Sequence, residues 1–69
     1  MKIEWEDGYE IRVTIDKGTA LISANREGLL SLARQLTAMA QEPVGSHIHY
    51  DQSNSLEEGS TELIIERIL

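Results

Sequence analysis

The stretch that decides the fold is residues 9–24, Tyr-Glu-Ile-Arg-Val-Thr-Ile-Asp-Lys-Gly-Thr-Ala-Leu-Ile-Ser-Ala. In its first half, apolar and polar side chains alternate, which is the period-two pattern of a β-strand with one buried face. Lys17-Gly18 then supplies a two-residue turn, and this turn places Ile22 opposite Val13. The stretch therefore predicts an antiparallel hairpin whose large apolar side chains share one face.

The preceding residues 2–6 alternate in the same way and predict a third strand of this meander. A two-residue turn at Asp7-Gly8 would leave the apolar residues of the two strands on opposite faces. A three-residue loop over residues 6–8 instead opposes Trp5 to Tyr9, so we favour the longer loop. The inner face of the meander is then expected to carry Ile3, Trp5, Tyr9, Ile11, Val13, Ile15, Ala20, Ile22 and Ala24.

A helix is predicted from Arg26 to about Glu42, with Asn25 as its N-cap and Pro43 as its stop. Its apolar residues recur at steps of three and four: Leu29, Leu32, Ala33, Leu36, Met39 and Ala40. Gly28 is unusual in the first turn, because glycine in a helix costs up to about 1 kcal/mol relative to alanine. Either another part of the chain approaches its backbone closely, or the helix begins irregularly.

The second half of the chain predicts two more strands. In residues 47–51, Ile48 and Tyr50 alternate with three polar residues, His47, His49 and Asp51. A Ser-x-x-Glu pattern followed by glycine predicts one helical turn in residues 55–59, and the last strand is expected over residues 61–68.

The whole chain, residues 1–69, is thus expected to form one α+β domain in the order β-β-β-α-β-β. One amphipathic helix would cover one face of an antiparallel sheet of about five strands. The uncovered face would show an apolar spot made by Leu21, Ile64 and Ile68. An acidic rim would surround that spot, and such a surface is a plausible contact site.

The net charge and the lack of cysteine limit which partners and which kinds of site are expected. The formal net charge is −6 and there is no cysteine. Such a surface disfavours nucleic acid and anionic membranes, and it favours a basic partner. The lack of cysteine excludes disulfides and thiolate zinc sites and suits a cytoplasmic protein. The first residues turn acidic at once, so we expect neither a targeting segment nor a membrane span, and we expect no cofactor.

Two imidazoles on one side of a strand also allow a metal-site hypothesis. His47 and His49 have a spacing that zinc sites use when a neighbouring strand adds a ligand, here Glu62 or Glu66. Asp51 is roughly 13 Å from His47 along an extended strand, too far to share the ion. A solvent-facing polar strand is the simpler interpretation. No motif raises the pKa of a carboxylate or activates Ser46, so we do not expect an enzyme.

Three pieces of the sequence together resemble a known family. They are Asn25-x-x-Gly28-Leu29-x-x-Leu32-Ala33, then Gly45-x-His47-x-His49-x-Asp51, then Leu56-x-x-Gly59-Ser60-x-Glu62-Leu63. In order and spacing they are similar to the bacterial immunity protein 32 family over about residues 20–68. The resemblance implies a small α+β antidote without catalytic duty, which binds a polymorphic toxin encoded beside it.

An acidic domain of this size suits occlusion of the cationic active site of a basic or nuclease-like toxin. The expected contact residues share one strand, the loop after it and the facing strand: His47, His49, Asp51, Glu57, Glu58 and Glu62. A competing acidic surface is expected on the first hairpin: Glu4, Glu6, Asp7 and Glu10. Two alternatives stay open, a His-based metal-binding or pH-responsive module and a homodimer that buries Leu21, Ile64 and Ile68.

Overall fold

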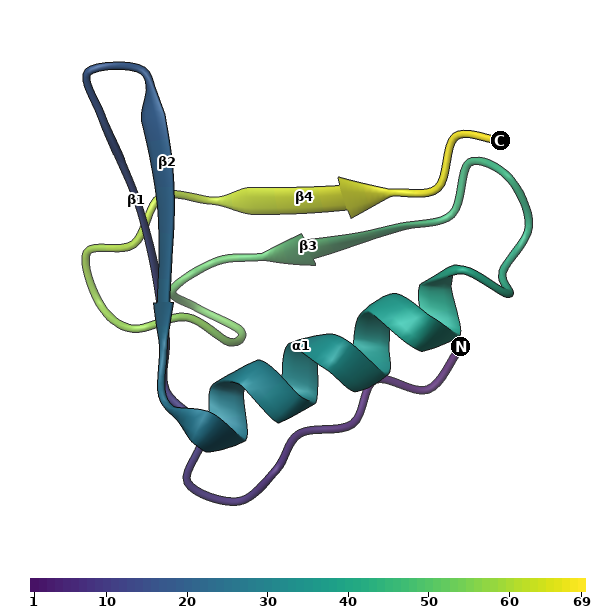
Figure 1. The fold of residues 1–69 in the computed structure, drawn as a ribbon, viewed down its shortest axis with the longest axis horizontal. Coiled ribbons are helices and arrows are strands. Elements are labelled where there is room, and N and C mark those ends of the chain that lie inside the picture. Colours follow the sequence, from purple (N-terminus) through teal and green to yellow (C-terminus); the bar gives the residue numbers. More distant parts are fainter.

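The computed structural model describes residues 1–69 and shows an α+β chain with four strands and one helix (Figure 1). The elements are β1 (Ile11–Asp16), β2 (Thr19–Ala24), α1 (Arg26–Met39), β3 (His47–Tyr50) and β4 (Leu63–Glu66). They form two separate two-stranded antiparallel sheets, β1-β2 and β3-β4. The prediction of one sheet of about five strands is therefore wrong, although the α+β class is correct.

The β1-β2 hairpin has the predicted register, with Val13 opposite Ile22 and Ile11 opposite Ala24. Lys17 and Gly18 both have positive φ, 50° and 80°. A two-residue turn of this kind matches the right-handed twist of the flanking strands, whereas ordinary turns would splay them. The local sequence thus accounts for the turn and the register of this hairpin.

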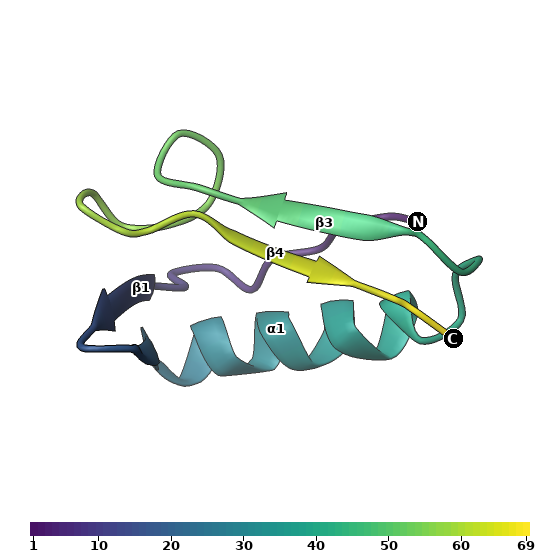
Figure 2. The ribbon, with the colours of Figure 1, turned by 90° about the horizontal axis from the view of Figure 1, so that it is seen from above.

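Residues 2–6 do not form the predicted strand, because the edge of β1 that they would occupy is taken by another segment. The backbone N–H of Glu57 donates to Ile11 O at 2.9 Å, and that of Thr61 donates to Val13 O at 2.7 Å. The N-terminal segment, residues 1–10, runs instead beside α1 (Figures 1 and 2). Side chains of α1 satisfy its backbone: Ser31 Oγ accepts from Glu6 N, and Gln35 Nε2 donates to Glu4 O, both at 2.8 Å.

The start of α1 agrees with the sequence, since the Asn25 side chain accepts from Gly28 N at 2.8 Å. A Cβ at position 28 would lie 2.5 Å from Glu10 O and 2.9 Å from Ile11 Cγ1, so close backbone approach explains the glycine. The helix ends at Met39, before the expected end at Glu42, and tighter turns follow it. Its buried side is Gly28, Ser31, Leu32, Gln35 and Met39, whereas Leu29 and Leu36 of the predicted apolar stripe are exposed.

The loop between β3 and β4 also differs from the prediction. Residues 55–59 form no helical turn. The Asp51 carbonyl accepts from the backbone N–H groups of Asn54, Ser55 and Leu56, so the tight turn comes earlier. The last strand is shorter than residues 61–68, because Thr61 pairs with β1 and only residues 63–66 pair with β3. The loop thereby joins the two sheets.

Seven apolar side chains form the core, where α1, β1, β3 and the loop after β3 meet: Ile11, Val13, Leu32, Met39, Ile48, Tyr50 and Leu56. Ile3, Ile15 and Ile22, which were expected on the inner face, are exposed. Ile15 and Ile22 are exposed because α1 crosses the hairpin only at the end opposite its Lys17-Gly18 turn, so the tip projects uncovered (Figure 1). Ile3 lies in the N-terminal segment, outside both sheets. No helix here has the length and apolarity that crossing a membrane requires.

Candidate functional site

β3 presents both histidines on the outer side of the β3-β4 sheet. Ile48 and Tyr50 point inward and are buried, so the alternating His47 and His49 are exposed. Their ring centroids lie 5.0 Å apart in an edge arrangement. The predicted pairing of the two imidazoles on one side of the strand is therefore present in the structure.

β4 and the residue before it complete this surface. The register places Glu66 opposite His47 and Ile64 opposite His49. Directly opposed residues of an antiparallel pair share a face. Glu62 Oε2 lies 3.6 Å from His49 Nδ1, and both side chains are about half exposed. We call this surface, His47, His49, Glu62, Ile64 and Glu66, the histidine face.

The histidine face is backed by an ordered polar contact in the core. The hydroxyl of Tyr50 donates to Gln35 Oε1 at 2.7 Å, and burial raises the pKa of this phenol above its ordinary value of 10.0. Trp5 stacks on Tyr9 at 4.3 Å and contacts the edge of Tyr50 at 6.2 Å. The packing of these rings and the Tyr50–Gln35 hydrogen bond limit the conformational freedom of β3, the strand that carries the histidines.

Asp51 does not belong to the histidine face. Its Oδ1 accepts from the backbone N–H of Ser53 at 2.8 Å and of Asn54 at 3.0 Å. This is the turn that an aspartate makes with its own following backbone. The structure thus gives Asp51 a conformational role at the end of β3.

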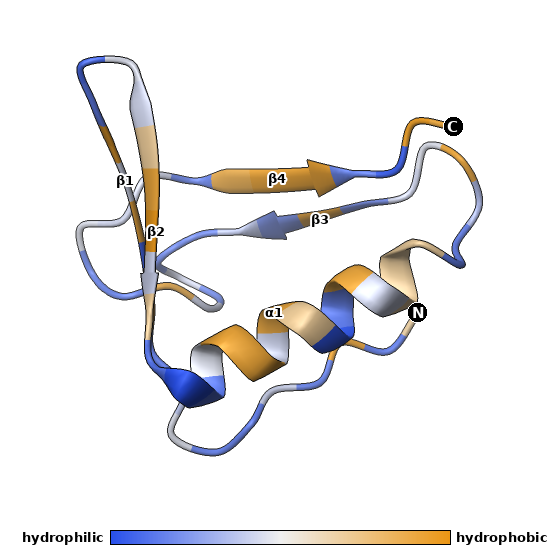
Figure 3. Cartoon of the chain, in the orientation of Figure 1, coloured by the Kyte–Doolittle hydropathy of each residue, from blue (hydrophilic) through white to orange (hydrophobic).

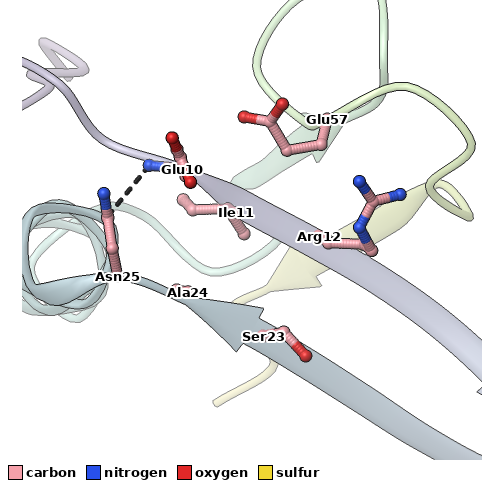
Figure 4. Close-up of a pocket in the computed structure, with 7 residues that line it drawn as sticks. All are labelled: Glu10, Ile11, Arg12, Ser23, Ala24, Asn25 and Glu57. Carbon is pink, nitrogen blue, oxygen red and sulfur yellow. Dashed lines mark hydrogen bonds between the residues drawn. The ribbon is translucent and has the colours of Figure 1, made fainter.

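Glu57 and Glu58 lie on the other edge of β1. Glu57 lines a shallow recess of about 360 Å³ together with Glu10, Arg12 and Asn25 (Figure 4). Arg12 Nη1 donates to the backbone carbonyl of Glu58 at 2.8 Å. The structure therefore separates these two glutamates from the histidines with which they were grouped, and it brings Glu57 beside Glu10 of the competing surface.

The competing acidic surface is divided as well. Arg34 of α1 lies 2.7 Å from a carboxylate oxygen of Glu6 and 4.0 Å from one of Glu4. Asp7 is exposed in the turn, and Glu10 lines the recess. Because two of the four carboxylates already have a cationic neighbour, they offer less net charge to a partner than the sequence indicates.

The geometry supplies no third ligand for the metal-site hypothesis. No group of three or more His, Cys, Asp or Glu side chains is placed to hold a metal ion. His47 Nδ1 is already 3.1 Å from the carbonyl of Gly45, and Glu62 approaches His49 alone. The face presents two imidazole rings, two carboxylates and one exposed aliphatic side chain.

Sequence reasoning missed two buried polar residues of α1: Gln35, which accepts from the Tyr50 hydroxyl beneath the face, and Ser31, which accepts from the backbone N–H of Glu6. Both are nearly inaccessible, at 2% and 0% exposed. Together with Gly28, Leu32 and Met39 they follow helical spacing, so a search for any residue at that period would have found them. A search for apolar residues alone selected the leucines instead.

Comparison with known protein families gives a match that covers the residues of the histidine face. The family described as Immunity protein 32 matches residues 19–68. No curated protein and no solved structure matches significantly. The matched region runs from β2 to the end of β4, so it contains the histidine face and leaves out the acidic residues Glu4, Glu6, Asp7 and Glu10.

Proposed function

Since the chain belongs to the Immunity protein 32 family, we propose that it is the antidote to a bacterial toxin and neutralises that toxin by covering its active site. The mechanism is occlusion and needs no chemistry from this chain. The proposed contact surface is the histidine face.

The position of the histidine face within the family-matched residues favours it as the contact surface. The histidine face is exposed, lies on paired strands and falls inside the family-matched residues 19–68. The first acidic segment falls outside that range, and Arg34 already lies near two of its carboxylates. Exposed residues on a rigid element can bind a partner without the entropy loss of ordering a loop.

The composition of the face fits a basic partner. The chain has a net charge of −6, and Glu62 and Glu66 stand on the face itself. Carboxylates pair with arginine and lysine at a site built for phosphate, as in a nuclease. Ile64 is 51% exposed and would add an apolar anchor between these charges.

The experiment uses the toxin domain encoded beside the gene of this chain, which the resemblance to the family predicts. Co-expression should restore bacterial growth, and calorimetry should show one-to-one binding between the chain and the toxin domain. The double variant His47→Ala/His49→Ala should bind about 30-fold more weakly or worse, as expected when central contacts are removed. A control variant, Glu4→Ala/Glu6→Ala, should bind as the unsubstituted chain does.

A second pair of substitutions, Glu57→Ala/Glu58→Ala, tests the recess beside β1. Loss of binding there, with the histidine variant unaffected, would move the contact surface to the recess. If the unsubstituted chain neither binds the neighbouring toxin domain nor protects growth, the antidote function itself is rejected.

A further inference from the structure

One side of α1 has no cover from its own chain. Leu29, Ala33 and Leu36 of α1 and Ala40, directly after it, follow one another at steps of four and three, and all four are exposed. We call them the apolar flank. Leu29 is 55% exposed and Leu36 is 48% exposed. Figure 3 shows apolar stretches along α1, β2 and β4.

β4 has a free edge. β4 pairs with β3 only. Arg67, just after β4, exchanges backbone hydrogen bonds with Gly45 and Ser46, which directs its N–H and C=O toward the β3 side. By alternation, the backbone groups of Ile64 and Glu66 point away from β3 and are available to another strand.

The chain exposes more surface than a compact monomer of its size. Its accessible area is 4839 Å². A folded monomer of 7.7 kDa has about 4,300 Å². The excess of about 500 Å² is more than half of the roughly 800 Å² that each partner contributes to a standard interface. The apolar flank and the free edge of β4 are the surfaces that such an interface would cover.

We propose that the partner is a second copy of this chain, joined through β4 about a two-fold axis. The copies would form one four-stranded sheet in the order β3-β4-β4-β3. A two-fold axis makes the two β4 strands antiparallel, and each then offers the same free backbone groups to the other. The apolar flanks of the two helices would lie beneath the joined strands and cover one another.

Charge selects one register for this pairing. With the axis at Ile65, each Ile64 faces Glu66 of the other copy, and no two like charges are directly opposed. An axis at Ile64 would oppose Glu62 to Glu66 twice, and an axis at Glu66 would oppose that residue to itself. Directly opposed like charges destabilise antiparallel pairs. The Ile65 axis is therefore the favoured one.

This dimer differs from the one that buries Leu21, Ile64 and Ile68. Leu21 belongs to the β1-β2 sheet and Ile64 to the β3-β4 sheet, so the single sheet face assumed for that dimer does not exist. The dimer proposed here needs no toxin and leaves the histidine face on the outside of the joined sheet. Its test therefore stands apart from the test of the antidote function.

The first test is sedimentation equilibrium of the isolated chain over micromolar to millimolar concentration. We expect twice the 7.7 kDa mass of the chain at the upper end. Leu36→Glu should weaken dimerisation by about 100-fold, because the symmetric interface contains the substitution twice. Leu30→Glu is the matched control, since Leu30 is also exposed on α1 but lies off the apolar flank, and it should dimerise normally.

Cysteine cross-linking then tests the register, since the chain has no cysteine of its own. Ile65→Cys should form a disulfide-linked dimer on mild oxidation, because directly opposed residues bring two Cα atoms within the range of a disulfide. Ile64→Cys should cross-link poorly. A mass of 7.7 kDa at every concentration overturns the proposal. So does a dimer that is insensitive to Leu36→Glu, or one that cross-links through residue 64 in preference to residue 65.

Discussion

The two flanks of α1 differ in how they are covered. On one flank the N-terminal segment is held by polar groups, with Ser31 and Gln35 bonded to its backbone and Arg34 beside its carboxylates. On the other flank Leu29 and Leu36 are exposed. The chain thus covers a polar flank of its helix and leaves two leucines of the predicted apolar stripe exposed, although Leu32 and Met39 of that stripe are buried.

The difference follows from hydrogen-bond requirements. An extended segment that is not paired in a sheet has backbone N–H and C=O groups without sheet partners. If these groups are buried, they need other hydrogen-bond partners. The side chains of α1 provide them, and no buried side-chain nitrogen or oxygen in the structure lacks a partner. A leucine side chain has no hydrogen-bond donor or acceptor for such a segment.

Gly28→Ala should destabilise the fold most, by about 3 kcal/mol, because overpacking a tight contact has effects of this size. The new Cβ would lie 2.5 Å from Glu10 O and 3.1 Å from the Ala24 Cβ. Urea unfolding followed by circular dichroism measures the change. If the variant is instead more stable, as alanine is at an unhindered helix position, the close approach of the hairpin to α1 is refuted.

Gln35→Ala should lower the free energy of unfolding by about 2 kcal/mol, because it leaves two groups without a hydrogen-bond partner. These groups are the Glu4 carbonyl and the Tyr50 hydroxyl. Gln41→Ala, at an exposed position just after the helix, is the matched control and should have little effect. Equal effects of the two substitutions would show that the polar flank does not hold the N-terminal segment.

Tyr50→Phe should lower the free energy of unfolding by about 1 kcal/mol at neutral pH, the net worth of one buried hydrogen bond. It should also change the alkaline pH dependence. Burial raises the pKa of Tyr50 in the folded state above 10.0, so its contribution is complete below pH 10.0 and is lost as pH rises through the raised pKa. Unfolding between pH 7 and 11 should show a steeper alkaline decline for the unsubstituted chain than for Tyr50→Phe. Parallel curves would contradict this.

Leu36→Gln should change the stability of the monomer least, by less than about 0.5 kcal/mol, because the side chain is already half exposed. Measurement at low micromolar concentration keeps the chain monomeric. A loss above about 2 kcal/mol there, the effect of removing a core leucine, would mean that the apolar flank is covered within one chain.

The candidate site was partly predictable. His47 and His49 fall on one side of β3 because alternation along a strand is a local property, and Glu62, just before the facing strand, lies near His49. Asp51, Glu57 and Glu58 were grouped with them because they belong to the same predicted strand or to the loop after it. The loop turns back at Asp51 and carries Glu57 to the edge of β1, which no short-range pattern encodes.

The sequence by itself determined the features that depend on neighbouring residues. These are the Lys17-Gly18 turn with the register of β1 and β2, the Asn25 cap, and the outward histidines of β3. Tertiary structure alone decided which segment occupies the second edge of β1, and therefore that there are two sheets and an N-terminal segment held by a helix. Residues 2–6 and residues 57–61 can both offer backbone hydrogen bonds to that edge, so local pattern cannot choose between them. The choice depends on the packing and hydrogen bonding of the whole chain, because each segment must also satisfy its remaining groups elsewhere.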